Sequence, residues 1–436
     1  MRVAWFSPLP PVRSGIAAYS AELLPLLEGN HVVERFAEAD AHNFVWKARR
    51  EPYDLVVYQH GNAPCHANKW AYLAAYPGLV VLHDARLHHA RARSLLNQRR
   101  FDDYRREFRY DHPDATPDFA EYAVEGLGGP IYYFWSMLRV VMRTARTVAV
   151  HNARVADELR EAYPDVPVEM IRMGVPRDTQ PNAPADLDRG EARSAARRAL
   201  ALPDESVVFA AFGKVTAEKR IAQVLGALGA LAAEGRDVRL LLVGDADAHA
   251  TLRDEMARHG VADRVQVTGH VPDEAIGLHL AAADVCLCLR WPTAQETSAS
   301  WLRCLAAARP TVVSDRANLV DVPTIDLRDR RTSPPGADAV AVRIDLMDED
   351  ASLRLAMRRL ADDGALRDRL AQAGHAYWAA HHTLDAMAAD YQRVFALAAS
   401  RPAPAPADLP KHFTEDHSST ARVIASRFGL SLEEVL

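Results

Sequence analysis

A glycine turn followed by two lysines is the feature of this sequence that most directly predicts chemistry. Gly213 follows an apolar run, Lys214 and Lys219 stand five residues apart, and a helical pattern of apolar residues begins at Ile221. The N–H groups and dipole of a helix start favour an anion, and the two ammonium groups add positive charge. The segment therefore indicates a diphosphate cradle, although basic residues in a first helical turn are also common without a ligand.

Two further loops in the second half of the chain leave apolar runs in the same way. Gly244 follows the run Val238–Val243, and His270 and Val271 follow the run Val265–Val267. If these runs are parallel strands, their carboxyl ends meet at one edge of a sheet, where the ligands of α/β domains bind. These three residues are therefore candidates for ligand contact.

A glutamate stands in a third such loop, just before a predicted helix. Thr297 and Ser298 are good N-cap residues, so the carboxylate of Glu296 is expected near the positive end of that helix. There it could accept hydrogen bonds from sugar hydroxyls, or it could be an ordinary acid that stabilises the helix start. Taken alone, the second interpretation is the more common one.

Glycine and histidine residues mark the corresponding loops of the first half. Gly15 opens a predicted helix over Ile16–Leu27, where the backbone can approach a ligand. Histidines follow the other apolar runs, at positions that line the cleft of an α/β domain: His60, His66, His83, His88, His89 and His151. Their spacings differ from the HExxH pattern of zinc sites, so hydrogen bonding to hydroxyl groups is favoured over metal ligation.

The apolar runs that precede these residues alternate with helical stretches. Nearly continuous apolar runs are expected for parallel strands with both faces covered, and the alternation predicts doubly wound α/β sheets. The runs form two series: residues 3–6, 54–58, 79–82 and 147–150, then residues 207–212, 238–243, 265–267, 285–288 and 311–313. Two Rossmann-like domains that face each other across a cleft are therefore expected.

The alternation pauses between the two series, and this pause sets the expected domain boundaries. The helix that follows the second domain is expected to pack back toward the first domain, and the last helix to be capped by Ser418–Thr420. The expected segments are a first domain over 1–176, a linker over 177–204 with a short helix at 191–200, a second domain over 205–383, a helix over 384–400, and a proline-rich spacer and tail over 401–436.

The composition excludes several classes of protein. The net charge of -6 argues against a dedicated nucleic-acid binder, and no apolar run approaches the roughly 20 residues of a membrane span. Met1–Phe6 is short and resembles a first strand rather than a signal peptide, so a cytoplasmic location is predicted. The four cysteines are too scattered for a disulfide framework and are expected to be buried, inert thiols.

Arginines are concentrated between Arg86 and Arg109, where they outnumber the acids and alternate with aromatic residues. A solvated helical face is the default interpretation of such a segment. The alternative is a basic amphipathic surface that contacts an anionic membrane or a phosphorylated, lipid-linked acceptor. That contact would place the protein at the inner face of the membrane.

Taken in order, these motifs resemble family 4 of the retaining glycosyltransferases (glycosyl transferases group 1), which have the GT-B fold. The resemblance covers roughly residues 1–396. Four segments carry it: Pro10–Ser20 resembles the first strand-to-helix loop, Gly213–Arg220 the diphosphate-binding pair, Val267–Pro272 the strand exit near the base, and Glu296–Asp315 the donor-sugar segment.

The resemblance implies a function and a role for each motif. The chain would move a sugar from a UDP-, GDP- or similar nucleotide-sugar donor to a glycan, lipid-linked or small-molecule acceptor, with retention and without a metal or other cofactor. Catalysis would rest on His83, Glu296, Lys214 and Lys219. The donor would contact Gly15, Gly213, Lys214, Lys219, Gly244, His270, Val271, Glu296, Thr297, Ser298 and Arg303.

One departure from the family pattern bears on these roles. The family places a second glutamate where this chain has Arg303 or Cys304. Recognition of the ribose by a carboxylate is therefore in doubt. Arg303 would contact the phosphate, contact the base, or lie exposed to solvent on its helix. Two other functions stay open: a nucleotide-sugar epimerase or hydrolase on the same architecture, and a catalytically silent nucleotide-sugar-binding protein.

Overall fold

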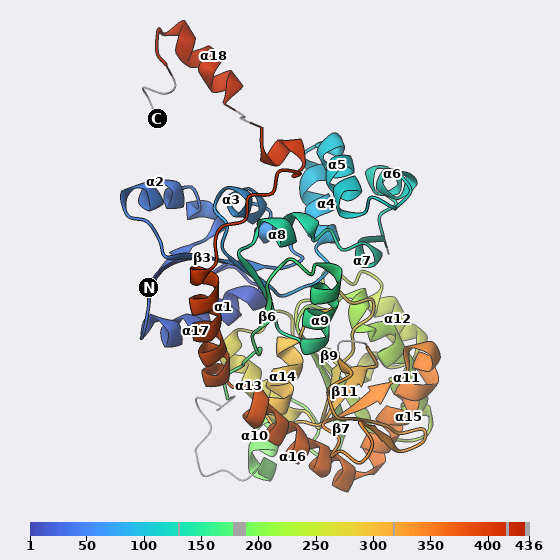
Figure 1. The fold of residues 1–436 in the computed structure, drawn as a ribbon. Coiled ribbons are helices and arrows are strands. Elements are labelled where there is room, and N and C mark those ends of the chain that lie inside the picture. Colours follow the sequence, from blue (N-terminus) through green and yellow to red (C-terminus); the bar gives the residue numbers. More distant parts are fainter. Residues whose placement is uncertain (130, 178–188, 317–318, 416–417, 432–436) are drawn as a thin grey trace.

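The computed structural model describes residues 1–129, 131–177, 189–316, 319–415 and 418–431. Two α/β domains lie one above the other, each built around its own sheet (Figure 1). Residues 178–188, which belong to the predicted linker, lie outside the described residues.

The first domain holds a six-stranded parallel sheet in the order β2-β1-β3-β4-β5-β6. The apolar runs predicted four of these strands and missed the two edge strands, because edge strands carry polar residues that interrupt the pattern. The bounds are β1 Arg2–Phe6, β2 Val32–Phe36, β3 Leu55–His60, β4 Leu79–Leu82, β5 Thr147–Val150 and β6 Val168–Met170.

Alternate residues of β1 show why this sheet is covered on both faces. Val3 and Trp5 belong to one buried apolar cluster, whereas Ala4 and Phe6 belong to another. The covering helices are α1 Gly15–Glu28, α2 Asn43–Arg50, α3 Lys69–Ala75, α4 His88–Asn97, α5 Phe101–Asp111, α6 Asp118–Val124, α7 Ile131–Phe134, α8 Arg139–Thr144 and α9 Ala153–Ala162.

The second domain holds an eight-stranded sheet in the order β13-β12-β14-β11-β10-β7-β8-β9, parallel except for the pair β12 and β13. Strands β12, β13 and β14 were not predicted, because they are short and carry few consecutive apolar residues. The strands are β7 Val207–Phe212, β8 Val238–Val243, β9 Val265–Val267, β10 Val285–Cys288, β11 Thr311–Ser314, β12 Thr324–Asp326, β13 Arg331–Ser333 and β14 Ala341–Ile344. The helices are α10 Arg189–Ala199, α11 Ile221–Ala233, α12 Leu252–Arg258, α13 Ile276–Ala282, α14 Ala299–Ala306, α15 Glu349–Asp362 and α16 Gly364–His381.

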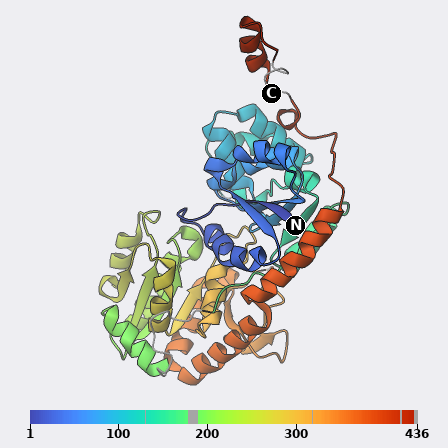
Figure 2. The same ribbon diagram turned by 90° about the vertical axis from the view of Figure 1, so that its left-hand side faces the viewer.

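Helix α17, Leu384–Ser400, crosses from the second domain and runs along the first (Figure 2). Its Asp390 accepts hydrogen bonds from the backbone and side chain of Arg172. A single buried apolar cluster contains Trp5 of the first sheet, Trp301 of α14 and Tyr391 of α17. The two domains and the crossing helix therefore share one continuous core.

The chain beyond α17 first lies on the first domain and then leaves it. The side chain of His412 is only 4% exposed and contacts Glu107 of α5, whose carboxylate also pairs with the buried Arg91. Helix α18, Ser419–Arg427, projects away from both domains (Figure 1). Ser418 occupies its N-cap position, but its side chain makes no capping hydrogen bond to the helix.

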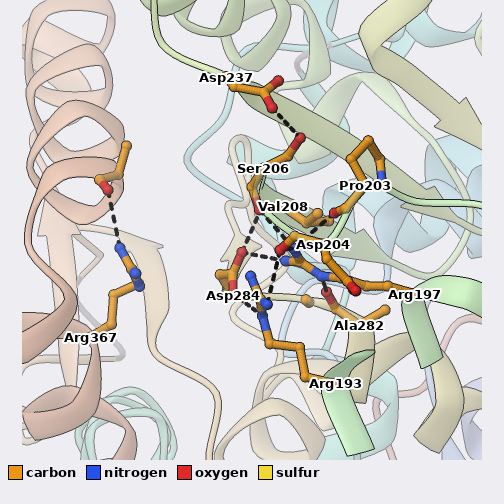
Figure 3. A network of polar contacts seen from close by, with 12 residues as sticks. Arg193, Arg197, Pro203, Asp204, Ser206, Val208, Asp237, Ala282, Asp284 and Arg367 are labelled. Carbon is orange, nitrogen blue, oxygen red and sulfur yellow. Dashed lines mark hydrogen bonds and ion pairs between the residues drawn. The ribbon is translucent and has the colours of Figure 1, made fainter. Parts of the chain in front are cut away.

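A buried arginine anchors α10 to the second sheet (Figure 3). The guanidinium of Arg197 is fully buried and donates to the backbone carbonyls of Ala282, Asp204 and Ser206. It also pairs with Asp284, whose Oδ2 accepts the backbone N–H of Val208 in β7. These bonds hold the start of β7 and β10 in place, and so position the carboxyl ends of both strands.

Replacing Arg197 by methionine is expected to lower the free energy of unfolding by about 3–5 kcal/mol, because it leaves buried carbonyl groups and Asp284 without their donor. Urea unfolding measures the change. Arg198→Met is the matched control, since Arg198 is exposed on the same helix, and its cost should stay within about 0.5 kcal/mol. Equal stability of the two variants would contradict the anchoring role.

Candidate functional site

The predicted anion cradle lies at the carboxyl end of β7. Gly213 has a positive φ of 87°, and a Cβ on it would lie 2.8 Å from Nζ of Lys219. A Cβ on Gly244, at the end of β8, would lie 2.4 Å from the carbonyl oxygen of Gly213. Both glycines are therefore required by close packing of the two strand exits, which leaves room at this edge for the lysine side chains.

The two lysines of the cradle differ in their surroundings. Lys214 is exposed, whereas Lys219 is half-buried and its ammonium group donates to the carbonyl of Phe212. Burial, followed by the charge of Arg290, lowers the pKa of Lys219 to about 7. Of the two lysines, only Lys214 is therefore exposed, because a short helical turn over Ala217–Lys219 directs the side chain of Lys219 inward.

Glu296 does not cap the helix that follows it. Ser298 is the N-cap residue of α14 and accepts from the N–H of Trp301, as predicted for this segment. The Glu296 carboxylate instead pairs with Arg290, at 2.9 Å, and with the buried Arg316, at 3.4 Å. Oε2 of the same carboxylate accepts from the Thr293 hydroxyl and from the Ala294 N–H.

Arg303 of α14 reaches the first domain. Its guanidinium pairs with Glu22 of α1, so it joins the two domains. Thr297 also contacts the first domain, through a 3.4 Å hydrogen bond from its hydroxyl to the carbonyl of His151. In the free protein Arg303 therefore forms an ion pair between the domains, and its role at the donor stays a prediction.

Three other predicted donor residues lie at the expected strand and helix ends without a polar contact that defines a role. Gly15 begins α1 and is exposed, with open space around its Cα. His270 is exposed after β9, and Val271 is half-buried against an apolar cluster that includes Phe212.

His83 lies at the carboxyl end of β4, facing the edge of the second sheet. Its Nε2 lies 2.8 Å from Oε1 of Gln59, and its ring packs edge-on to Tyr19 at 4.7 Å. Burial, followed by the charge of His151, holds the pKa of His83 well below its ordinary value. The imidazole is therefore neutral at physiological pH and acts as a hydrogen-bonding group.

Of the other histidines, His151 lies beside His83, with ring centroids 5.0 Å apart. His88 contacts the hydroxyl of Tyr104, whereas His66 contacts the buried ammonium of Lys69. Nearby, the ring of the buried His60 packs edge-on to that of Trp70 at 5.2 Å. Among the residues with described positions, no group of three or more histidines, cysteines or acids is arranged to hold a metal ion.

Asp84 is a residue that the sequence reasoning missed, although it directly follows His83. Its Oδ2 accepts the backbone N–H of Asn62 at 2.6 Å. Burial, followed by the charge of Glu296, raises the pKa of Asp84 to about 7. Asp84 of the first domain and Glu296 of the second therefore face each other across the site.

Several contacts hold the two strand edges together around these residues. The N–H of Ala85 donates to the carbonyl of Ala294 at 2.8 Å. The hydroxyl of Tyr133, on α7, donates to Glu218 in the cradle at 2.9 Å. Neither contact was predicted, because neither residue has a local sequence signal for a partner in the other domain.

Half of the arginines between Arg86 and Arg109 are neutralised. Four of them, Arg91, Arg100, Arg105 and Arg106, form ion pairs with acids of α5 or α6. Arg86 instead contacts Gln295 of the second domain. The segment is therefore largely a paired helical surface. No helix in the described ranges is long and apolar enough to cross a membrane.

Comparison with known proteins agrees with this geometry. Residues 206–344, which span β7 to β14, match the family model of glycosyl transferases group 1. The alpha-D-kanosaminyltransferase of Streptomyces kanamyceticus is 28% identical over 57% of this chain, and the alignment covers only 59% of that relative.

Two solved structures share the fold across both domains. The sucrose-phosphate synthase of Thermosynechococcus elongatus aligns with a TM-score of 0.64 and 15% identity, over 91% of this chain and 100% of its own. HepE of Anabaena, in complex with UDP and glucose, aligns with a TM-score of 0.62 and 15% identity over the same shares. The GT-B fold is thus confirmed, residues 206–344 resemble group 1 glycosyltransferases, and assignment to family 4 stays a prediction.

Replacing Glu296 by glutamine is expected to lower the free energy of unfolding by about 1–3 kcal/mol, because it leaves the charges of Arg290 and Arg316 without their carboxylate. Thermal or urea unfolding measures the loss. Glu274→Gln is the control, since Glu274 is exposed in the same domain. Equal stability of both variants would show that the carboxylate does not hold the two arginines.

Proposed function

We propose that the chain transfers a sugar from a nucleotide-sugar donor to a hydroxyl group of an acceptor. One observation carries the proposal: the cradle of Gly213, Lys214 and Lys219 lies at one sheet edge, and Tyr133 of the first domain reaches its Glu218. His83, Asp84 and Glu296 lie at the facing edges. The match of the second domain to group 1 glycosyltransferases supports the same function.

The cradle supplies the charge that a leaving diphosphate needs. Lys214 offers an exposed ammonium group, and the N-terminal end of α11 adds its dipole. The pKa of Lys219 is about 7 in the free protein, and two phosphate charges beside it would raise that value. Donor binding therefore favours the charged form of Lys219, which then stabilises the leaving group.

In this proposal, His83 and Glu296 at the facing sheet edges orient the sugar. The neutral His83 forms a hydrogen bond with a sugar hydroxyl, while Glu296, fixed by two arginines, accepts another. The bond from the anomeric carbon to the diphosphate breaks as the bond to the acceptor oxygen forms on the same face, and the diphosphate takes the acceptor proton. In this proposal, transfer proceeds with retention and Glu296 is not a covalent nucleophile.

The acceptor is proposed to be a glycan, a lipid-linked sugar or a small molecule. A contact with anionic lipid would rest on Arg93, Arg99 and Arg109, which are exposed and form no ion pair in the part of the chain with described positions. These charges lie on α4, α5 and the turn between them, at the far end of the first domain from the second sheet (Figure 1).

The proposal is tested by native mass spectrometry with UDP-glucose, UDP-N-acetylglucosamine, ADP-glucose and GDP-mannose. We expect one donor to bind, and Lys214→Ala to weaken it by about 10- to 100-fold without a change in melting temperature, since one charge-assisted contact is lost. Lys219→Met should weaken binding as well but also lower stability, because Phe212 loses its donor. Arg198→Met serves as the charge-matched control.

The products separate the remaining alternatives. Release of nucleoside diphosphate without any acceptor, faster than with one, would indicate a hydrolase, and a changed sugar on an intact donor would indicate an epimerase. Binding without turnover across a broad acceptor panel would indicate a silent binding protein. Absence of binding by all four donors would contradict the proposed function.

Metal independence follows from the same charges. Lys214, Lys219 and the N-terminal end of α11 neutralise the charge of the diphosphate. We therefore expect the rate of sugar transfer to be unchanged in excess EDTA. The rate of diphosphate release before and after chelation is the measurement. If chelation abolishes diphosphate release and Mg²⁺ or Mn²⁺ restores it, the proposal that Lys214 and Lys219 neutralise the diphosphate is contradicted.

A further inference from the structure

A chain of buried hydrogen bonds joins the crossing helix α17 to the candidate histidine. Nε2 of Gln59 donates to the hydroxyl oxygen of Tyr391 at 3.0 Å, and Oε1 of Gln59 lies 2.8 Å from Nε2 of His83. Gln59 and Tyr391 have no exposed surface, and His83 retains 8%. Water therefore has no access to the Gln59–Tyr391 bond.

The amide of Gln59 fixes the direction of the second bond. An amide oxygen can only accept, so Nε2 of His83 must carry the proton. Nδ1 is then the ring nitrogen without a proton, and it can only accept. In the observed arrangement Nε2 of Gln59 donates to the Tyr391 hydroxyl, so the amide oxygen is the atom that lies beside His83.

We propose that Tyr391 is a positioning residue for His83: acting through Gln59, it holds the imidazole in the Nε2–H tautomer, so that Nδ1 accepts a hydrogen bond from a hydroxyl group of the donor sugar. The contact with the sugar rests on the proposed function. Without the Tyr391 hydroxyl, the Gln59 amide can turn over and present its NH₂ to His83, which moves the proton to Nδ1.

Tyr19 provides a matched control on the same hydroxyl pair. Its oxygen lies 2.7 Å from that of Tyr391, and both rings are buried in one apolar cluster. Tyr19→Phe removes a hydroxyl but leaves the bond between Gln59 and Tyr391 in place. Tyr391→Phe removes that bond. A purely structural role for the pair predicts similar effects of the two variants.

The tautomer is measured directly by ¹H–¹⁵N NMR of the histidine side chains in the free protein, with His83→Asn to assign the signal. We expect the Nε2–H form of His83 in the wild type and in Tyr19→Phe, and the Nδ1–H form or a mixture in Tyr391→Phe. An unchanged His83 tautomer in Tyr391→Phe overturns the proposal, whatever the stability of the variant.

A kinetic measurement tests the contact with the sugar. With the donor selected by the binding screen, Tyr391→Phe should lower kcat on the order of tenfold while the Kd of the nucleoside diphosphate stays constant, since one hydrogen bond at the sugar is lost. Tyr19→Phe should keep kcat. Equal kcat in both variants overturns the contact. A wild type that binds no donor contradicts the proposed function, whereas the NMR result still decides the tautomer.

Discussion

The site depends on one buried apolar cluster that joins elements far apart in the chain. Tyr19 of α1 and Tyr391 of α17 bring their hydroxyl oxygens to 2.7 Å inside a cluster that also contains Trp301 of the second domain. Helix α17 follows the second domain in sequence but packs on the first (Figure 2). The apolar burial of this cluster, rather than the hydroxyl pair alone, holds the two domains and α17 together.

The arrangement of charges follows from that placement. The carboxyl ends of β4 and β7 belong to different sheets, and contacts such as Ala85 to Ala294 hold these edges within hydrogen-bonding distance. Burial between the edges then lowers the pKa of Lys219 and raises that of Asp84. Both groups lie within the influence of Arg290, and perturbed groups of opposite type that lie together are typical of a functional site.

Much of the fold was predictable from the sequence, because buried parallel strands leave continuous apolar runs such as Val238–Val243. Strands such as β2 and β13 were not, since polar residues interrupt the apolar run of β2 and make up all of β13, and their pairing depends on neighbours elsewhere in the chain. In the site, strand-end residues such as Gly213 and His83 were recognised from position and type. The partners of Arg303, Tyr133 and Gln59 were not, because a contact between domains leaves no local pattern.

The central claim is that the diphosphate of a nucleotide lies between the two sheets on the Gly213–Lys219 cradle. A crystal structure with UDP or GDP tests it most directly. The account predicts phosphate oxygens within hydrogen-bonding distance of Nζ of both Lys214 and Lys219, with the N–H groups at the start of α11 facing them. A nucleotide bound instead in the cavity of about 370 Å³ beside Trp378, with the cradle empty, would contradict it.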